Sequence, residues 1–245
     1  MASGSAWTTG VWTAARWPLA ALGLGAGAYA AYAGLTWYRY GHVRRATADE
    51  ADSLLDRYMP AYDVVDRHCA RVEATAAQTL EAARNLELFQ RPLVRTIVRA
   101  RELLLGATPD EEQRPRGLLG ETLSLGWGVL AEEPGREIVV GAVTRPWEAN
   151  VRFRSIPPHE FAGFAEPGYV KIAWTLRADP IGPAASVFRT ETRAVATDPE
   201  ARARFRRYWA FLSPGIKLIR LLALRPVAAA ASKRALARRA SSGSA

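Results

Sequence analysis

The stretch that decides the fold is residues 169–195, YVKIAWTLRADPIGPAASVFRTETRAV. In both of its halves, apolar side chains or hydroxyls occupy every second position, and mostly charged or small residues lie between them. This alternation is typical of half-buried strands, and the Pro and Gly residues in the middle are turn formers. The stretch therefore predicts two antiparallel strands, 169–177 and 186–195. The side chains expected to share the inward face are Ile172, Trp174, Leu176, Phe188, Thr190 and Thr192.

The period of two also appears upstream of this pair. Residues 124–131, 136–145 and 151–156 are separated by Pro, Gly or acidic turns, which is the pattern of an antiparallel meander. Val140 and Ala142 are the inward candidates of the middle segment. Residues 64–72 are β-branched and half-alternating, so they predict a further strand at the start of the domain.

Helical signals lie on both sides of the meander. Residues 75–88 and the segment from Pro92 to Gly106 carry apolar residues at helical spacing. After the last strand, Asp198 suits an N-cap and Pro199 the first helical position, so a longer helix is expected there.

The order strand, two helices, several strands and long helix predicts an α+β fold, in which the last helix closes the concave face of a curved antiparallel sheet. Phe205, Trp209 and Leu212 form one stripe of that helix and would face the sheet. The dipeptide Pro214-Gly215 is expected to kink or break the helix.

The N-terminal region differs from the rest of the chain in its hydrophobicity pattern. Residues 17–38 contain no charged side chain over about the length that a helix needs to cross a bilayer. A retained anchor, a cleaved signal peptide and a buried helix all fit this run, and the anchor is favoured because aromatic residues flank it. Arg39, Arg44 and Arg45 follow the run, whereas only Arg16 precedes it, which predicts a single-pass membrane protein with its domain in the cytoplasm. Residues 46–59 are expected to be a linker.

The net charge of +9 is concentrated near the C-terminus. Eleven Lys or Arg residues and only two acidic residues lie between Asp198 and Arg239, so this segment carries the whole surplus. Such an end can bind nucleic acid or an anionic membrane, or can be a solvated tail. Nucleic acid is not expected, because the aromatic residues of the segment lie on the apolar stripe. We expect residues 214–239 to lie on an anionic membrane surface and residues 227–245 to be disordered.

The sequence lacks the motifs of common catalytic and metal sites. The chain has one cysteine, Cys69, and three histidines without metal-ligand spacing, so no metal and no cofactor are expected. It has neither a GxSxG elbow nor a phosphate-binding glycine loop after a strand. Asp63, Asp66 and His68 cluster on the first strand, and we expect them to be a solvated outer face. No catalytic residue is assigned.

Several words of the sequence, in this order, resemble the helix-grip superfamily of START-like, birch-pollen-allergen-like and polyketide-cyclase proteins, and more narrowly an uncharacterised bacterial branch of it. The words are YDVV (62–65), RARELLLG (99–106), LAEEPGRE (130–137), FAEPGY (164–169), TETR (190–193), ATD (196–198) and RFRRYW (204–209). The resemblance covers residues 60–226 and implies a sheet wrapped around the long C-terminal helix. It implies no site residue, because the superfamily includes transport, sensing and catalysis.

The concave face is the candidate functional site. Small residues there predict a pocket walled by aromatic side chains, although a filled core explains the same pattern equally well. The expected ligand-binding residues are Ala142, Trp174, Phe188, Thr190, Thr192, Phe205 and Trp209. The favoured function is a membrane-tethered, non-enzymatic module that binds a hydrophobic small molecule or lipid. The alternatives are a cyclase or dehydratase using Thr190 or Thr192, and a scaffold acting through the basic C-terminal end.

Overall fold

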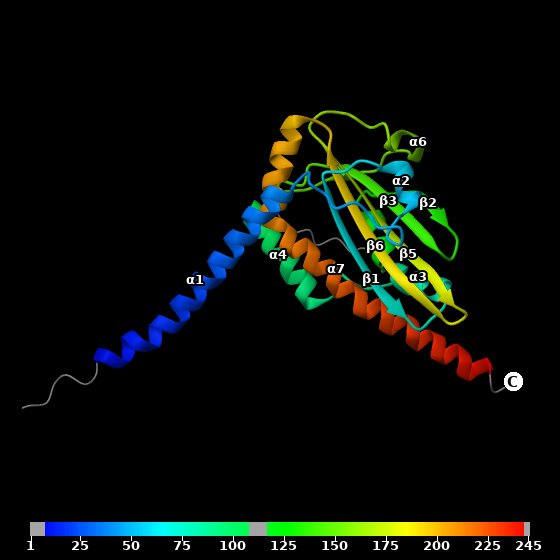
Figure 1. The fold of residues 1–245 in the computed structure, drawn as a ribbon, viewed down its shortest axis with the longest axis horizontal. Coiled ribbons are helices and arrows are strands. Elements are labelled where there is room, and N and C mark those ends of the chain that lie inside the picture. Colours follow the sequence, from blue (N-terminus) through cyan, green and yellow to red (C-terminus); the bar gives the residue numbers. More distant parts are fainter. Residues whose placement is uncertain (1–7, 108–116, 243–245) are drawn as a thin grey trace, which may run out of the picture.

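The computed structural model describes residues 8–107 and 117–242, with side chains described for residues 23–107 and 117–237. Its centre is a six-stranded antiparallel sheet with the order β1-β6-β5-β3-β2, in which β4 pairs with β3 (Figure 1). This arrangement confirms the predicted antiparallel sheet. The strands are β1 (Val64–Val72), β2 (Gly128–Glu133), β3 (Glu137–Thr144), β4 (Phe153–Arg154), β5 (Val170–Gly182) and β6 (Ala185–Ala196).

Helices cover both faces of the sheet. α3 and α7 pack on the face that we call the inner face, and α2 and α6 pack on the opposite, outer face. The helices are α1 (Thr8–Arg39), α2 (Ser53–Tyr58), α3 (Ala76–Arg84), α4 (Pro92–Leu105), α5 (Leu118–Ser124), α6 (Pro158–Phe161) and α7 (Pro199–Ser242). The predicted helix 75–88 is shorter than expected, but Thr75 does cap it in a capping box with Gln78. α5 and α6 were not predicted.

The strand register confirms the predicted alternation. Trp174 pairs with Thr192 between β5 and β6, and Ala142 pairs with Ile172 between β3 and β5. Since side chains alternate across a strand, this register places all the predicted inward residues of the sheet on the inner face. The core there joins the sheet to α3, α5 and α7.

α7 begins as predicted and ends much later than predicted. The carboxylate of Asp198 accepts hydrogen bonds from the backbone N–H groups of Glu200 and Ala201, which is N-cap geometry. The helix continues through Pro214, and Figure 1 shows its axis changing direction where α1 crosses it. Pro214 explains the bend, because it removes a backbone donor and its ring crowds the preceding turn.

The expected disordered tail over residues 227–245 is wrong as far as Ser242, the last described residue. Val227, Ala231 and Ala235 are spaced by one helical turn and are buried in the core against the sheet and α3. The high density of arginines concealed this apolar stripe in the sequence. The folded domain therefore extends beyond the predicted boundary at residue 226.

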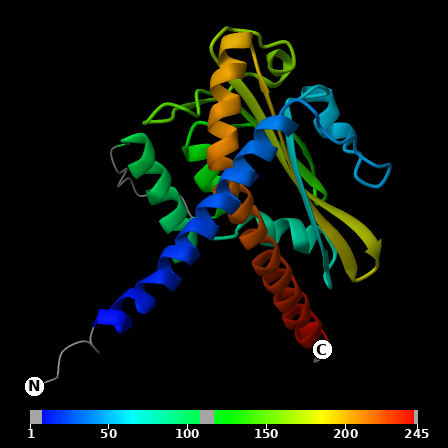
Figure 2. The ribbon, with the colours of Figure 1, turned by 60° about the vertical axis from the view of Figure 1, so that its left-hand side comes forward.

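The C-terminal half of α1 packs against α7 near its bend (Figure 2). Tyr32 Oη and Ser213 Oγ lie 3.0 Å apart, and the Arg206 guanidinium donates to the carbonyl of Trp37. Among the described residues, no helix has the length and hydropathy of a membrane span. Residues 17–22 of the predicted anchor lie outside the described side chains.

Candidate functional site

The seven predicted ligand-binding residues are all buried at the inner face, but they belong to different parts of it. Trp174 and Phe188 lie in the core cluster beneath the C-terminal part of α7. Phe205 and Trp209, which belong to the N-terminal part of that helix, lie in a separate cluster with Ala194 of β6. Ala142, Thr190 and Thr192 are also buried. The structure thus distributes the predicted residues along the interface between the sheet and α7, and does not gather them around a single point.

A polar cluster lies on this same face, where the sequence analysis placed none. His68 Nε2 is 3.0 Å from Asp66 Oδ2, and Arg220 of α7 brings its Nε to 3.7 Å from the same oxygen. The side chain of Asp66 is buried, and that of Arg220 is 19 % exposed. The predicted solvated face for Asp66 and His68 is therefore wrong. The counter-charge that permits their burial comes from α7, far away in the sequence.

The charges in this cluster stabilise each other. Burial opposes ionisation of Asp66, but the hydrogen bond from His68 and the charge of Arg220 outweigh it and lower the pKa of the carboxyl below its ordinary value. Burial lowers the pKa of Arg220, and the charge of Asp66 acts in the opposite direction. The cluster is consequently a buried ion pair with a histidine at its side.

Two polar atoms beside Asp66 have no hydrogen-bond partner among the described residues. They are Thr192 Oγ1 and Arg220 Nε. Thr192 is 8 % exposed and is the register partner of Asp66 across β1 and β6. Leaving a buried polar group without a partner costs about 1–3 kcal/mol, so such groups in native proteins require an explanation.

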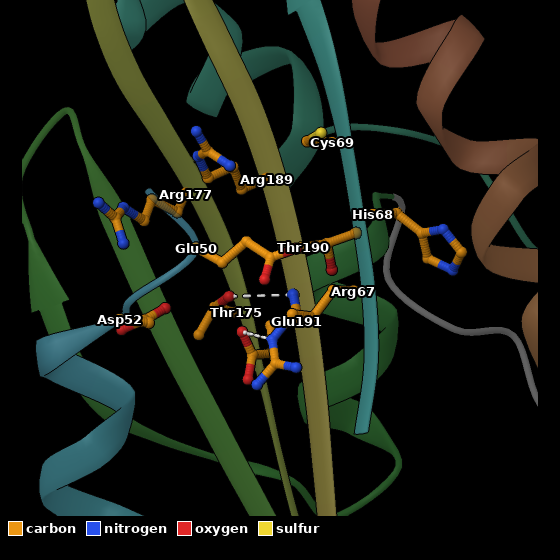
Figure 3. A pocket seen from close by; sticks show the side chains of 10 residues that line it. All are labelled: Glu50, Asp52, Arg67, His68, Cys69, Thr175, Arg177, Arg189, Thr190 and Glu191. Atoms are coloured by element: carbon orange, nitrogen blue, oxygen red, sulfur yellow. Dashed lines mark hydrogen bonds and ion pairs between the residues drawn. The ribbon is translucent and has the colours of Figure 1, made fainter. Parts of the chain in front are cut away.

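Two pockets are found in the described part of the chain, and His68 of the polar cluster and the predicted ligand-binding residue Thr190 are among the residues that line the smaller one. One, of about 60 Å³, is on the outer face beneath residues 50–52, and Figure 3 shows the arginines and carboxylates that line it. Arg67 donates to Glu191 there, while Arg177 and Arg189 both bind Asp179. In the same view His68 points away from this pocket toward α7. The charges of the small pocket are thus already paired within the protein.

The second pocket is a larger groove of about 600 Å³ between α1, α4 and α7. Its lining is mainly apolar, and it does not include any of the seven predicted residues. Neither pocket resembles a metal centre: the described residues contain no group of three or more His, Cys, Asp or Glu side chains arranged to hold a metal ion. His159 Nε2 lies 3.3 Å from Oε1 of its neighbour Glu160, and both side chains are exposed.

Comparison with solved structures returns proteins that match most of this chain at low sequence identity. A norcoclaurine synthase from Thalictrum flavum is 15 % identical over 72 % of this chain and 96 % of its own, with a TM-score of 0.35. A hypothetical protein from Helicobacter pylori is 10 % identical over 76 % and 98 %, with a TM-score of 0.36. The Zhui aromatase/cyclase from Streptomyces is 14 % identical over 70 % and 94 %, with a TM-score of 0.21.

Neither family models nor curated proteins give a match to the sequence. The class of the protein is therefore defined by its own topology. An antiparallel sheet whose inner face is crossed by a long C-terminal helix is the helix-grip fold, as the sequence resemblance implied.

Proposed function

We propose that this domain binds a hydrophobic small molecule or lipid between the inner face of the sheet and α7. The observation that carries the proposal is that two buried polar atoms beside Asp66, Thr192 Oγ1 and Arg220 Nε, have no hydrogen-bond partner among the described residues, while most of the surrounding inner face is apolar. Small-molecule sites commonly combine apolar walls with a few placed polar groups. Each of the two atoms can donate a hydrogen bond to an acceptor oxygen of a ligand.

The chemistry of the cluster defines the class of ligand. Arg220 Nε donates a hydrogen bond, the Thr192 hydroxyl can donate or accept one, and Trp174 supplies an apolar wall next to Thr192. The expected ligand is therefore an amphipathic molecule with a hydrophobic body and one carbonyl, carboxylate or hydroxyl group. Since Asp66 already neutralises Arg220, a neutral polar group is as suitable as an anion.

Native mass spectrometry and lipid extraction of the purified protein test this proposal directly. A fluorescent fatty acid then serves as the probe for displacement by the recovered molecule. Thr190→Trp should fill the space next to Thr192 and abolish probe binding with little change in melting temperature. Strong destabilisation by this substitution, about 1–3 kcal/mol as in an overpacked core, together with no binding by the parent protein, would end the proposal.

An enzyme is the second candidate function, and the Asp66–His68 pair favours it. A histidine held by a carboxylate is a common general acid or base, and this one faces the proposed ligand. The test compares the molecules that co-purify with the wild-type protein and with His68→Gln. If the site is catalytic, the two proteins carry chemically different molecules, substrate and product. A binding module carries the same molecule in both.

Membrane attachment is a separate part of the proposal. It is supported by the uncharged run 17–38 and by Leu24, Tyr29 and Leu35 of α1, which are exposed. The outward side of α7 also combines exposed Leu218, Leu221 and Leu236 with basic residues, which suits an anionic membrane surface. We propose a single-pass anchor with the domain on the cytoplasmic side.

Fusions after Ala245 test this topology. A fluorescent protein should be active there and alkaline phosphatase inactive, and the reverse result would overturn the assignment. For α7, residues 47–245 are sedimented with anionic and with neutral vesicles. Stronger binding to the anionic vesicles is expected, weakened by salt, and equal binding to both would contradict a surface role for the basic end.

A further inference from the structure

The groove of about 600 Å³ lies outside the inner face and has its own set of walls. α1 contributes Tyr29, the last turn of α4 contributes Leu104 and Leu105, and the loop after β3 contributes Trp147. The first half of α7 forms the remaining wall. Its volume is within the range of pockets that hold small molecules, roughly 300–1,000 Å³. Figure 2 shows α1 crossing in front of α7, with the sheet behind, and α4 to the left of α7.

The side chains that line the groove are mainly apolar, and several of them are largely exposed to solvent. Leu104 is 74 % exposed and Phe211 is 56 % exposed, which is unusual for large side chains that lie close together. The nearby hydroxyls are already used: Tyr29 donates to the carbonyl of Phe211, and Tyr208 accepts from Arg101. The groove therefore offers apolar contact to a ligand and few hydrogen bonds along its length.

Cations lie at one end of the same helix wall. One side of α7 lines the groove. It carries Arg204, then Arg207 and Tyr208 one turn later, and then Phe211 and Leu212 after a further turn. Over the seven residues from Arg204 to Phe211 the helix rises about 10 Å. Arg204 is paired with Glu200 at 2.6 Å, whereas Arg207 forms no ion pair with another described residue. A guanidinium in this state is well suited to a phosphate.

We propose that this groove holds an anionic membrane phospholipid, with an acyl chain against Leu104 and Phe211 and the phosphate at Arg207. The α7 side of the groove is cationic at Arg204 and Arg207 and apolar at Phe211 and Leu212. An anionic phospholipid fits this order, with its phosphate at the cationic end and its acyl chain at the apolar end. Exposed apolar side chains continue from the groove along α4 at Leu103 and along α1 at Leu24. A bilayer can cover all of these at once. The inference is independent of the ligand proposed for the inner face.

The test uses the full chain in mild detergent, mixed with equal amounts of phosphatidylglycerol and phosphatidylcholine and analysed by native mass spectrometry. The wild-type protein should retain phosphatidylglycerol in preference, and Arg207→Gln should reduce that preference roughly tenfold, as expected for one charge-assisted contact. Arg71→Gln is the matched control, because Arg71 is an exposed arginine at the distant end of β1. It should keep the preference.

A second pair of variants locates the acyl chain. Leu104→Ser replaces an exposed side chain, so it should lower retention of both lipids without changing the melting temperature. Ile181→Ser is the matched control, because Ile181 is an exposed apolar residue near the end of β5 and lines neither site, and it should have no effect on retention. Equal retention of the two lipids by the wild-type protein, or an equal loss in Arg207→Gln and Arg71→Gln, would overturn the proposal. An equal loss in Leu104→Ser and Ile181→Ser would also overturn it, since it would show that retention does not depend on the groove.

Discussion

Neighbouring residues of β6 meet opposite environments on the two faces of the sheet. On the outer face, Arg193 is 2 % exposed and donates to Glu191 at 2.7 Å, to Asp56 at 2.5 Å and to the carbonyl of Met59 at 2.7 Å. On the inner face, the hydroxyl of Thr192 is equally enclosed and has no described partner. Buried polar groups therefore have two different roles here. Arg193 attaches α2 and residues 46–59 to the sheet, whereas the hydroxyl of Thr192 makes no hydrogen bond within the described protein, which is why we propose it as a ligand contact.

The largest effect is expected from breaking the outer network. Arg193→Ala would leave Glu191 and the Met59 carbonyl without this partner inside the protein, so we expect a loss of about 3–5 kcal/mol in the free energy of unfolding. Chemical denaturation measures it. Arg71→Ala removes an exposed ion pair and should cost about 0–1 kcal/mol. A loss for Arg193→Ala no larger than that of Arg71→Ala would show that the outer network does not hold α2.

The inner ion pair should give a smaller effect that depends on pH. Asp66→Asn removes the counter-charge of Arg220 and should cost about 1–3 kcal/mol at pH 7. Because the pKa of Asp66 is lowered in the folded protein, its contribution is present above pH 4 and is lost as the pH falls through that lower value. Unfolding measured at pH 7 and again below pH 4 should show the two proteins converging. A constant difference would contradict the role of the charge.

Glu137, also on the outer face, differs from the ion-paired carboxylates around Arg193. Burial and the neighbouring Asp52 raise the pKa of Glu137, although Arg177 lies 4.0 Å away and acts against this. A raised pKa means that stability is highest at low pH and falls as the pH rises past that of a free glutamate. Glu137→Gln, which mimics the protonated form, should therefore stabilise the protein at pH 8 by roughly 1 kcal/mol and should have no effect at pH 4. Equal stabilisation at both pH values would refute the assignment.

The smallest effect on stability is expected at Thr192. This position tests most directly whether the unpaired hydroxyl of the inner face serves a ligand and not the fold. Thr192→Val keeps the shape and removes a hydroxyl that has no described partner, so the melting temperature should not fall. Affinity for the fatty-acid probe should decrease about five- to tenfold, the loss of one hydrogen bond. Thr175→Val is the control, because Thr175 Oγ1 accepts from the backbone of Glu191 and its loss should destabilise the protein. The reverse pattern would make Thr192 structural.

The sequence predicted those parts of the fold that depend on local patterns. Alternation in residues 169–195 defined two strands and the correct inward face, and Asp198-Pro199 defined the start of α7. The length of α7 could not be predicted, because Val227, Ala231 and Ala235 are small residues within a basic segment and resemble a tail. Their burial depends on the surface of α3 and the sheet beneath them.

The polar part of the candidate site was missed for a related reason. Alternation placed Asp66 and His68 on one face, but two charged or polar residues on a strand usually face water. The signal that contradicts this is Arg220, which lies more than 150 residues later and approaches Asp66 only when α7 folds across the sheet. The strand β1 already offered a clue, since Val64 and Val72 have the same parity as Asp66 and are apolar.

The order of the elements, with α7 following the last strand, has a consequence for biosynthesis. During translation the sheet cannot close early, because β1 pairs with β6 across an intervening segment of more than 100 residues. Even a complete sheet exposes its inner face until Val227, Ala231 and Ala235 have left the ribosome. Folding of this domain must therefore wait until the second half of α7 has been synthesised. A nascent chain stalled before residue 223 should bind chaperones that recognise exposed apolar surface, and release of the full chain should end that binding.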